Sequence, residues 1–162
     1  MPMKTMILIS LILLMNVLPA GQDAPKKGLP AASEEVRFRL ASPSRPVLLV
    51  PVYVKGQGPF EFVLDTGASA TVVSAEFARA NGIQGGASKE GVGAGGKVQI
   101  SMGSVESLTL GGAEVRNLAV AIMDLDALRA ATGAKFDGIL GYNFLKQFRV
   151  TIDYRKGTLQ LE

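Results

Sequence analysis

Short apolar runs separated by glycine-rich turns restrict the fold of this chain more than any other feature of its sequence. Residues 45–54, RPVLLVPVYV, are mainly apolar and rich in β-branched side chains, and the next four residues, KGQG, are typical of a turn. In the PFEFVLD stretch that follows, Phe60, Phe62 and Leu64 alternate with other residues and would lie on one face of a strand. This pattern predicts a domain built mainly from short strands.

The rest of the chain predicts two hairpins and few helices. The predicted hairpins cover residues 106–123, with a turn at Gly111-Gly112, and residues 148–162. The predicted helices are short and cover residues 75–81, residues 142–148 and, at most, residues 124–131. Many short strands without a long internal repeat indicate an all-β domain, either a barrel or a sandwich.

The composition excludes several classes of site. With 162 residues, the chain has room for one domain with a modest core. It contains no cysteine and no histidine, which removes disulfides, thiol nucleophiles, imidazole bases and the usual zinc ligands. No metal or cofactor is expected, so acid–base chemistry falls to carboxylates, lysine, tyrosine or water. No basic run with interleaved aromatic residues is present, and a nucleic-acid partner is therefore not expected.

The N-terminal segment reads as a signal for export. In residues 1–21, Lys4 precedes an apolar run at 6–18, and small residues follow that run. The run is too short to cross a bilayer comfortably, which favours a cleaved signal peptide and an exported protein, periplasmic or secreted, without a stable membrane span. Anchoring by an uncleaved N-terminal segment is the alternative. Residues 22–33 read as a flexible linker, and residues 34–162 as the folded domain.

Two stretches carry the candidate chemistry. In VLDTGASATVV, residues 63–73, Asp65 stands between two apolar segments, so its loop is expected to lie inside the protein. An ionised carboxylate there is costly unless hydrogen bonds or a shared proton offset the lost hydration. Farther on, FDGILGYNFL at residues 136–145 contains a second apolar strand that ends in glycine. An Asp-Thr-Gly turn alone is a weak signal, but a buried strand beside the acid-bearing loop would explain both stretches.

In this order, the two stretches resemble the aspartic proteases. A single copy in a short chain resembles their retropepsin branch, the one-domain proteases of retroviral type, and the DGILGY and TIDY segments resemble bacterial members. The resemblance covers residue 45 to the C-terminus. It implies a single-domain, retropepsin-like closed β-barrel with one or two short helices, and the activity of an aspartic-type endopeptidase.

The resemblance also implies a role for each residue of the motifs. Asp65 would be the catalytic acid or base. Thr66 corresponds to a threonine whose hydroxyl bonds across a dimer axis, and Gly67 would turn the chain and offer its amide to the carboxylate. Ala68 follows the retroviral pattern, and Ser69 would be a substrate-facing or structural polar group. The residues that would pack under this loop as structural support are Ile139, Leu140 and Gly141.

One such carboxylate is only half of a catalytic site. Peptide hydrolysis needs a base to activate water and an acid to protonate the carbonyl, and two close carboxylates that share one proton supply both. Because the chain holds a single motif, the second Asp65 must come from another copy in a homodimer that acts on peptides or unfolded proteins. The alternative is a noncatalytic peptide-binding or assembly module of the same fold.

Other residues in the sequence have plainer interpretations. Asp137 could be taken for a second catalytic acid, but a turn or hydrogen-bonding role is favoured, and Asp153 is expected to be a hairpin carboxylate. A glycine-rich segment lies where the family carries its flap, and its flap candidates are Gly91, Val92, Gly93, Ala94, Gly95 and Gly96. A surface loop is the alternative for this segment. A phosphate-binding loop is disfavoured because the Lys-Ser ending and the following helix of a P-loop are missing.

Overall fold

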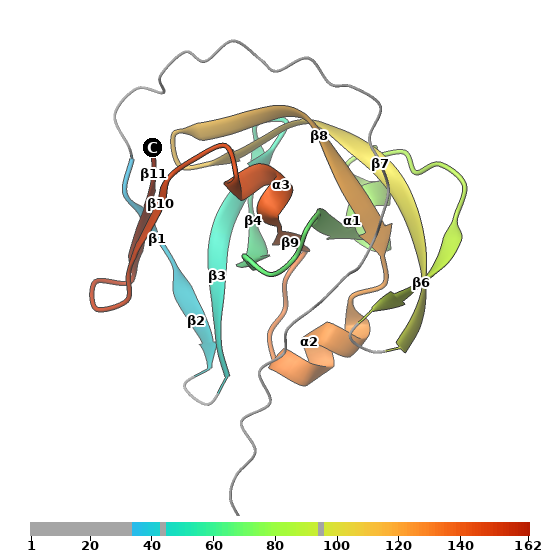
Figure 1. The fold of residues 1–162 in the computed structure, drawn as a ribbon, viewed down its shortest axis with the longest axis horizontal. Coiled ribbons are helices and arrows are strands. Elements are labelled where there is room, and N and C mark those ends of the chain that lie inside the picture. The colour runs from blue at the N-terminus through green and yellow to red at the C-terminus, as the bar shows by residue number, and fades with distance from the viewer. Residues whose placement is uncertain (1–33, 43–44, 94–95) are drawn as a thin grey trace, which may run out of the picture.

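The computed structural model describes residues 34–42, 45–93 and 96–162, and these form eleven strands and three short helices (Figure 1). The strands are β1 (Val36–Arg37), β2 (Arg39–Ser42), β3 (Arg45–Val54), β4 (Gln57–Leu64), β5 (Thr71–Ser74), β6 (Lys89–Gly93), β7 (Gly96–Leu110), β8 (Ala113–Met123), β9 (Gly138–Leu140), β10 (Val150–Asp153) and β11 (Thr158–Leu161). The helices are α1 (Ala75–Ala80), α2 (Asp126–Thr132) and α3 (Tyr142–Leu145). The predicted signal peptide and linker, together with Ala94 and Gly95, lie outside the described residues.

Eight strands form one sheet that closes on itself. Their order is β2-β3-β4-β9-β5-β8-β7-β6, and an additional pairing joins β3 to β7. In that pairing Tyr53 lies opposite Thr109 and Val54 lies opposite Leu108. The run from β3 to β7 therefore becomes a ring, which is the arrangement of a barrel (Figure 1). The predicted all-β barrel is confirmed.

Neighbouring residues of the barrel strands contribute to two different apolar clusters, because successive side chains point to opposite faces of a strand. In β4, Phe62 and Leu64 belong to the larger cluster, whereas Val63 packs against the smaller one. In β9, Leu140 belongs to the larger cluster and Ile139 to the smaller. Residues on both sides of α2 also belong to the smaller cluster, so this cluster connects α2 with one face of the sheet.

Helix α1 begins and ends as the sequence predicts. The Oγ of Ser74 accepts a 3.0 Å hydrogen bond from the amide of Phe77 and thereby caps the first turn. Past the end of the helix, Gly82 has a φ of +64°, a conformation that glycine adopts without strain. The ring of Phe77 packs edge-on against Phe60 and Phe62, with centroids 4.8 and 5.7 Å away. These contacts fix the helix on the barrel.

Helix α3 is shorter than the predicted segment at residues 142–148. It ends at Leu145, because the amides of Gln147 and Phe148 donate to carbonyls only three residues back, those of Phe144 and Leu145. Such bonds tighten the last turn and end the helix. The ring of Phe148 still packs on that of Phe144, with centroids 5.3 Å apart.

A smaller sheet of three strands, in the order β1-β11-β10, stands beside the barrel (Figure 1). Strands β10 and β11 form the predicted closing hairpin. Asp153 stabilises its turn, since Oδ1 accepts 3.0 Å hydrogen bonds from the amides of Arg155 and Lys156. The interpretation of Asp153 as a hairpin carboxylate is therefore confirmed. None of the helices in the described ranges is long and apolar enough to cross a membrane.

Candidate active site

The loop that carries Asp65 crosses the end of strand β9. Strand β9 lies between β4 and β5, parallel to the first and antiparallel to the second. The amide of Asp65 donates a 3.1 Å hydrogen bond to the carbonyl of Leu140, and the amide of Tyr142 donates a 2.7 Å bond to the carbonyl of Ala68. The two sequence stretches that resemble aspartic proteases are thus held together, backbone to backbone.

Asp65 is a half-buried residue, and its carboxylate has a backbone donor close to it. The amide of Gly67 donates a 2.8 Å hydrogen bond to its Oδ1. A donor of this kind compensates a carboxylate for part of the water that it loses in a protein. A Cβ on Gly67 would lie only 3.2 Å from the same oxygen, so glycine suits this close approach. Thr66 and Ser69 are exposed, whereas Ala68 is buried in the smaller cluster.

Gly141 lets the second stretch approach the Asp65 loop. A Cβ at this position would overlap the carbonyl of Ala70 and would lie 2.8 Å from the amide nitrogen of Thr71. Ile139 and Leu140, which precede it, are both buried. These three residues form the layer directly beneath the loop.

The buried Thr71 and the half-buried Asn143 form a side-chain link that the sequence patterns did not point to. Both the amide and the hydroxyl of Thr71 donate 2.8 Å hydrogen bonds to Oδ1 of Asn143. The amide of Gly141 donates to Thr71 Oγ1 at 3.2 Å, and Asn143 Nδ2 donates to the carbonyl of Ala119 at 2.7 Å. The available signal was a short polar residue within each of two apolar runs, since buried polar groups need partners.

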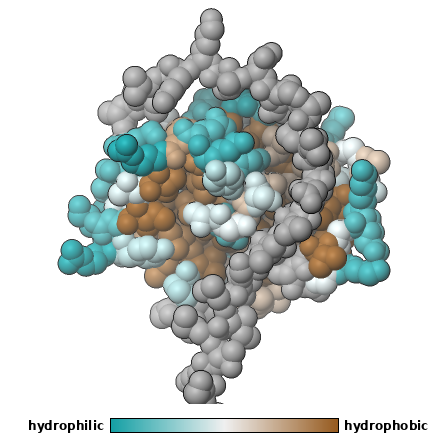
Figure 2. Space-filling view, in the orientation of Figure 1, coloured by the Kyte–Doolittle hydropathy of each residue, from teal (hydrophilic) through white to brown (hydrophobic). Residues whose placement is uncertain are grey.

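Asp65 lines a small apolar cavity of about 210 Å³. The other residues that line it are Pro46, Val47, Leu48, Val63, Leu64, Leu128, Thr132, Phe136 and Ile139. In the view of Figure 2, hydrophobic surface is visible left of the centre, and hydrophilic residues lie above it and at the margins. The single carboxylate of this cavity therefore lies among apolar side chains.

A larger cavity of about 610 Å³ lies between the β6–β7 hairpin and α2, and Asp65 does not line it. The hairpin contributes Lys97, Val98 and Gln99, and α2 contributes Asp126, Ala127 and Leu128. Leu128 lines both cavities, so it separates the apolar cavity at Asp65 from the larger space under the hairpin.

The described flap candidates lie in the β6–β7 hairpin. Gly91, Val92 and Gly93 end β6, and Gly96 begins β7 opposite Gly93. The Val92 side chain is 71% exposed. None of these four residues lines the cavity at Asp65.

Asp137 has a structural position. Its amide donates a 2.7 Å hydrogen bond to the carbonyl of Glu61, and its Oδ2 accepts a 3.2 Å bond from the amide of Glu61. Its carbonyl accepts a 3.0 Å bond from the amide of Ser74. Burial raises the pKa of Asp137, although the Glu61 amide and the charge of Arg129 act in the opposite direction. Asp137 thus joins β4 and β5 to the segment before β9, as the sequence predicts.

No metal centre is apparent in the part of the chain that the structure describes. There, no three histidine, cysteine, aspartate or glutamate residues gather closely enough to hold a metal ion.

Comparisons with known proteins agree with this geometry. A family model described as aspartyl protease matches residues 50–144, more than half of the chain and both stretches of the site. Among solved structures, the chain is similar to a retropepsin-like aspartic protease from Rickettsia conorii, with 18% identity and a TM-score of 0.52 over 80% of this chain and 89% of that one. It is also similar to the retroviral protease-like domain of Ddi1 from Leishmania major, with 20% identity and a TM-score of 0.50 over 72% of this chain and 88% of that one.

A comparison with curated proteins found no match. The likeness to the two solved structures concerns the fold, and the family model covers the loop of Asp65 and the strand beneath it. The chain therefore belongs to the aspartyl protease family and has the retropepsin-like fold.

Proposed function

We propose that this protein is an aspartic endopeptidase that hydrolyses peptide bonds between two Asp65 carboxylates, one from each chain of a homodimer. The observation that carries the proposal is the position of Asp65, which lies on a loop held by a backbone hydrogen bond to β9 and lines an apolar cavity. Membership in the aspartyl protease family supports the same reaction. The substrates would be peptides or unfolded proteins.

In the part of the chain that the structure describes, no second carboxylate lines the cavity beside Asp65. Asp137 lines neither cavity, and its carboxylate accepts a hydrogen bond from the Glu61 amide. A twofold axis next to the loop would bring a second Asp65 opposite the first, and the exposed Thr66 would bond across that axis.

In the proposed reaction, the two carboxylates share one proton. The ionised Asp65 removes a proton from a water molecule while the water oxygen forms a bond to the peptide carbonyl carbon. The protonated Asp65 of the other chain gives its proton to the carbonyl oxygen. When the tetrahedral intermediate collapses, the carbon–nitrogen bond breaks and the amine takes the proton that the first Asp65 removed from water. The second Asp65, now ionised, accepts the proton of one hydroxyl group as the carboxylic acid product forms. The carboxylates then return to their shared-proton state.

The β6–β7 hairpin is proposed to cover bound substrate through residues Gly91 to Gly96. Glycine-rich backbone is weakly restrained, so its amides should exchange hydrogen rapidly in the free protein. A bound peptide-like inhibitor should slow this exchange. Equal protection with and without inhibitor would identify the segment as an ordinary surface hairpin.

Residues 1–21 are proposed to direct the protein out of the cytoplasm, to the periplasm or the medium. N-terminal sequencing of the exported protein should find a start near residue 22. A start at Met1 in a membrane fraction would favour the anchored alternative.

The decisive test is Asp65→Asn. Against a mixed peptide library, this variant should lose activity by about a hundredfold or more, since it removes the acid–base group. Glu106→Gln, an exposed position on β7, is the matched control and should keep full activity. Circular dichroism should show the same fold for all three proteins. A noncatalytic module would instead bind peptides with and without the substitution and cleave none.

A further inference from the structure

Helix α2 forms one wall of the cavity at Asp65, yet its own residues are at most half-buried. Leu128 and Thr132 of this helix line the cavity, and Phe136 follows after the turn at Gly133. None of the seven residues of α2 is fully buried. Since burial contributes most of the energy that fixes a helix on a domain, α2 depends on the buried residues at its two ends, Leu125 and Phe136, and on polar contacts.

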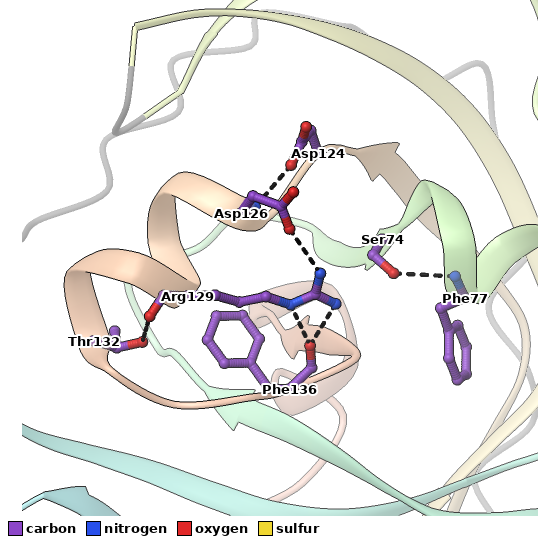
Figure 3. Close-up of polar contacts among 7 residues, drawn as sticks. All are labelled: Ser74, Phe77, Asp124, Asp126, Arg129, Thr132 and Phe136. Atoms are coloured by element: carbon purple, nitrogen blue, oxygen red, sulfur yellow. Dashed lines mark hydrogen bonds and ion pairs between the residues drawn. The ribbon is translucent and has the colours of Figure 1, made fainter.

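Those polar contacts converge on Arg129. Its Nε and Nη2 both donate to the carbonyl of Phe136, at 2.9 and 2.8 Å. Its Nη1 donates to Oδ1 of Asp126 at 3.0 Å, and its guanidinium carbon lies 5.9 Å from the centre of the Phe136 ring. Figure 3 shows the side chain running from α2 toward Phe136, where both nitrogens reach the same oxygen. Arg129 of α2 thus binds the backbone of Phe136, which lines the cavity after the end of the helix.

The two hydrogen bonds from Arg129 to the Phe136 carbonyl should contribute more to holding α2 in place than the ion pair of Arg129 with Asp126. The Arg129 side chain is 25% exposed, whereas that of Asp126 is 78% exposed, and an ion pair with one exposed partner contributes little. The carbonyl of Phe136 accepts from a charged donor, which makes a stronger bond than a neutral one. The link from α2 to Phe136 therefore depends mainly on the guanidinium fork.

The helix itself is closed at both ends by local bonds. Asp124 Oδ1 accepts a 2.7 Å bond from the amide of Asp126 (Figure 3). Thr132 Oγ1 donates a 2.8 Å bond to the carbonyl of Leu128 and lies 3.3 Å from that of Arg129. These bonds stabilise α2 as a unit but do not attach it to the barrel. The Arg129 fork joins this unit to Phe136, which is buried in the smaller cluster.

We propose that Arg129 is a positioning residue that fixes α2 and thereby determines which apolar substrate side chain the cavity at Asp65 accepts. The proposal rests on the proposed function, because it takes the small cavity as a site for a residue next to the cleaved bond. Leu128 separates this cavity from the larger one under the β6–β7 hairpin. If α2 shifts, Leu128 shifts with it, the separation weakens, and discrimination by side-chain size is lost.

The kinetic test uses matched peptides that differ only in one residue beside the cleaved bond: alanine, valine, leucine or phenylalanine. In Arg129→Ala, the ratio of kcat/KM between the best and the poorest peptide should fall about tenfold, mainly through KM. Arg129→Lys keeps a charged donor and should recover part of the ratio. Leu128→Ala leaves the fork intact but removes the dividing side chain, and it should favour phenylalanine. Arg116→Ala, an exposed arginine on β8, should leave all ratios unchanged.

A second measurement separates this inference from the proposed function. Asp65→Asn and the double variant Asp65→Asn/Arg129→Ala are titrated with the same peptides, fluorescently labelled, and binding is followed by anisotropy. A size preference that Arg129→Ala removes supports the inference even if no protein cleaves peptides. An unchanged preference overturns it even if cleavage depends on Asp65. An equal loss of kcat for every peptide, together with a lower Tm, also overturns it, because that outcome describes a purely structural arginine.

Discussion

Oγ1 of Thr71 donates a 2.8 Å hydrogen bond to Oδ1 of Asn143, a residue that lies 72 positions farther along the chain. The bond joins the strand that follows the Asp65 loop to the helix that follows the second stretch of the site. Thr71 is fully buried, and its hydroxyl also accepts a bond from the amide of Gly141. This pair therefore links both halves of the site by side chains, in addition to the backbone bonds of β9.

Removing only the Thr71 hydroxyl should show how much this link contributes to the free energy of unfolding. Thr71→Val keeps the volume but leaves the Gly141 amide without its acceptor in a buried position, at a cost of about 1–3 kcal/mol. Urea denaturation should give this loss in the free energy of unfolding, and cleavage activity should fall as the loop loosens. Thr151→Val, on an exposed position of β10, is the control and should change stability by less than about 0.5 kcal/mol. Equal stability of the two variants would count against the link.

Gly141→Ala should be costly for a steric reason. The added methyl would overlap the carbonyl of Ala70 and crowd the amide of Thr71, so the Asp65 loop would have to move away from β9. Overpacking of this kind costs about 1–3 kcal/mol, or more where backbone must shift. Thermal unfolding and peptide cleavage should both report the change. Gly112→Ala is the matched control, since its nearest neighbour would be Cβ of Glu34 at 3.8 Å.

Asp137→Asn should make the protein less sensitive to pH. Burial raises the pKa of Asp137 above its ordinary value of 3.8, so the folded protein holds this proton more tightly than the unfolded chain. The stabilisation is therefore complete below the ordinary pKa and is lost as the pH rises through the folded pKa. Asparagine keeps an acceptor for the Glu61 amide and has no proton to lose.

Urea denaturation from acid to neutral pH provides the measurement. The stability of the wild type relative to Asp137→Asn should decline as the pH rises, and the variant should be at least as stable at pH 7. Glu106→Gln serves as the control for the general effect of removing one acidic group. A relative stability of the wild type that increases with pH would contradict this sign.

The strand pattern of the fold was predictable because it depends on local alternation. Phe62 and Leu64 lie on one face of β4 and Val63 on the other, as the period of two requires. The turn at Gly111-Gly112 was equally predictable, since glycine marks tight turns. Closure of the barrel could be predicted only from the resemblance to a known family. The pairing of Tyr53 with Thr109 joins residues far apart in the chain, and no local pattern specifies it.

The same distinction applies to the site. Asp65 and its loop carry a recognisable motif, whereas the wall formed by α2 does not. Arg129 donates to the backbone carbonyl of Phe136. Because every residue has a backbone carbonyl, the sequence does not indicate which one accepts the bond. Thr71 and Asn143 were missed for a related reason, because a single polar residue in an apolar run does not reveal which distant partner satisfies it. Such side-chain partners can be identified only from the three-dimensional positions of the strands.

The proposed sharing of the site between two chains makes a quantitative prediction for mixtures of wild type and Asp65→Asn. If chains exchange freely and a dimer needs both carboxylates, only a wild-type chain with a wild-type partner is active. At constant wild-type concentration, an equal amount of Asp65→Asn should therefore reduce activity to about one half, and a fivefold excess to about one sixth. Adding Glu106→Gln instead should increase activity, because it contributes intact carboxylates.

Dilution provides the complementary measurement, with sedimentation on the same samples. Activity per chain should fall as the protein is diluted below its dimer dissociation constant, since the monomer holds one carboxylate where the reaction needs two. A monomeric enzyme or binding module predicts no such fall and no inhibition by Asp65→Asn. Activity that stays proportional to wild-type concentration in both experiments, while sedimentation shows the dimer dissociating, would rule out a site shared between two Asp65 residues.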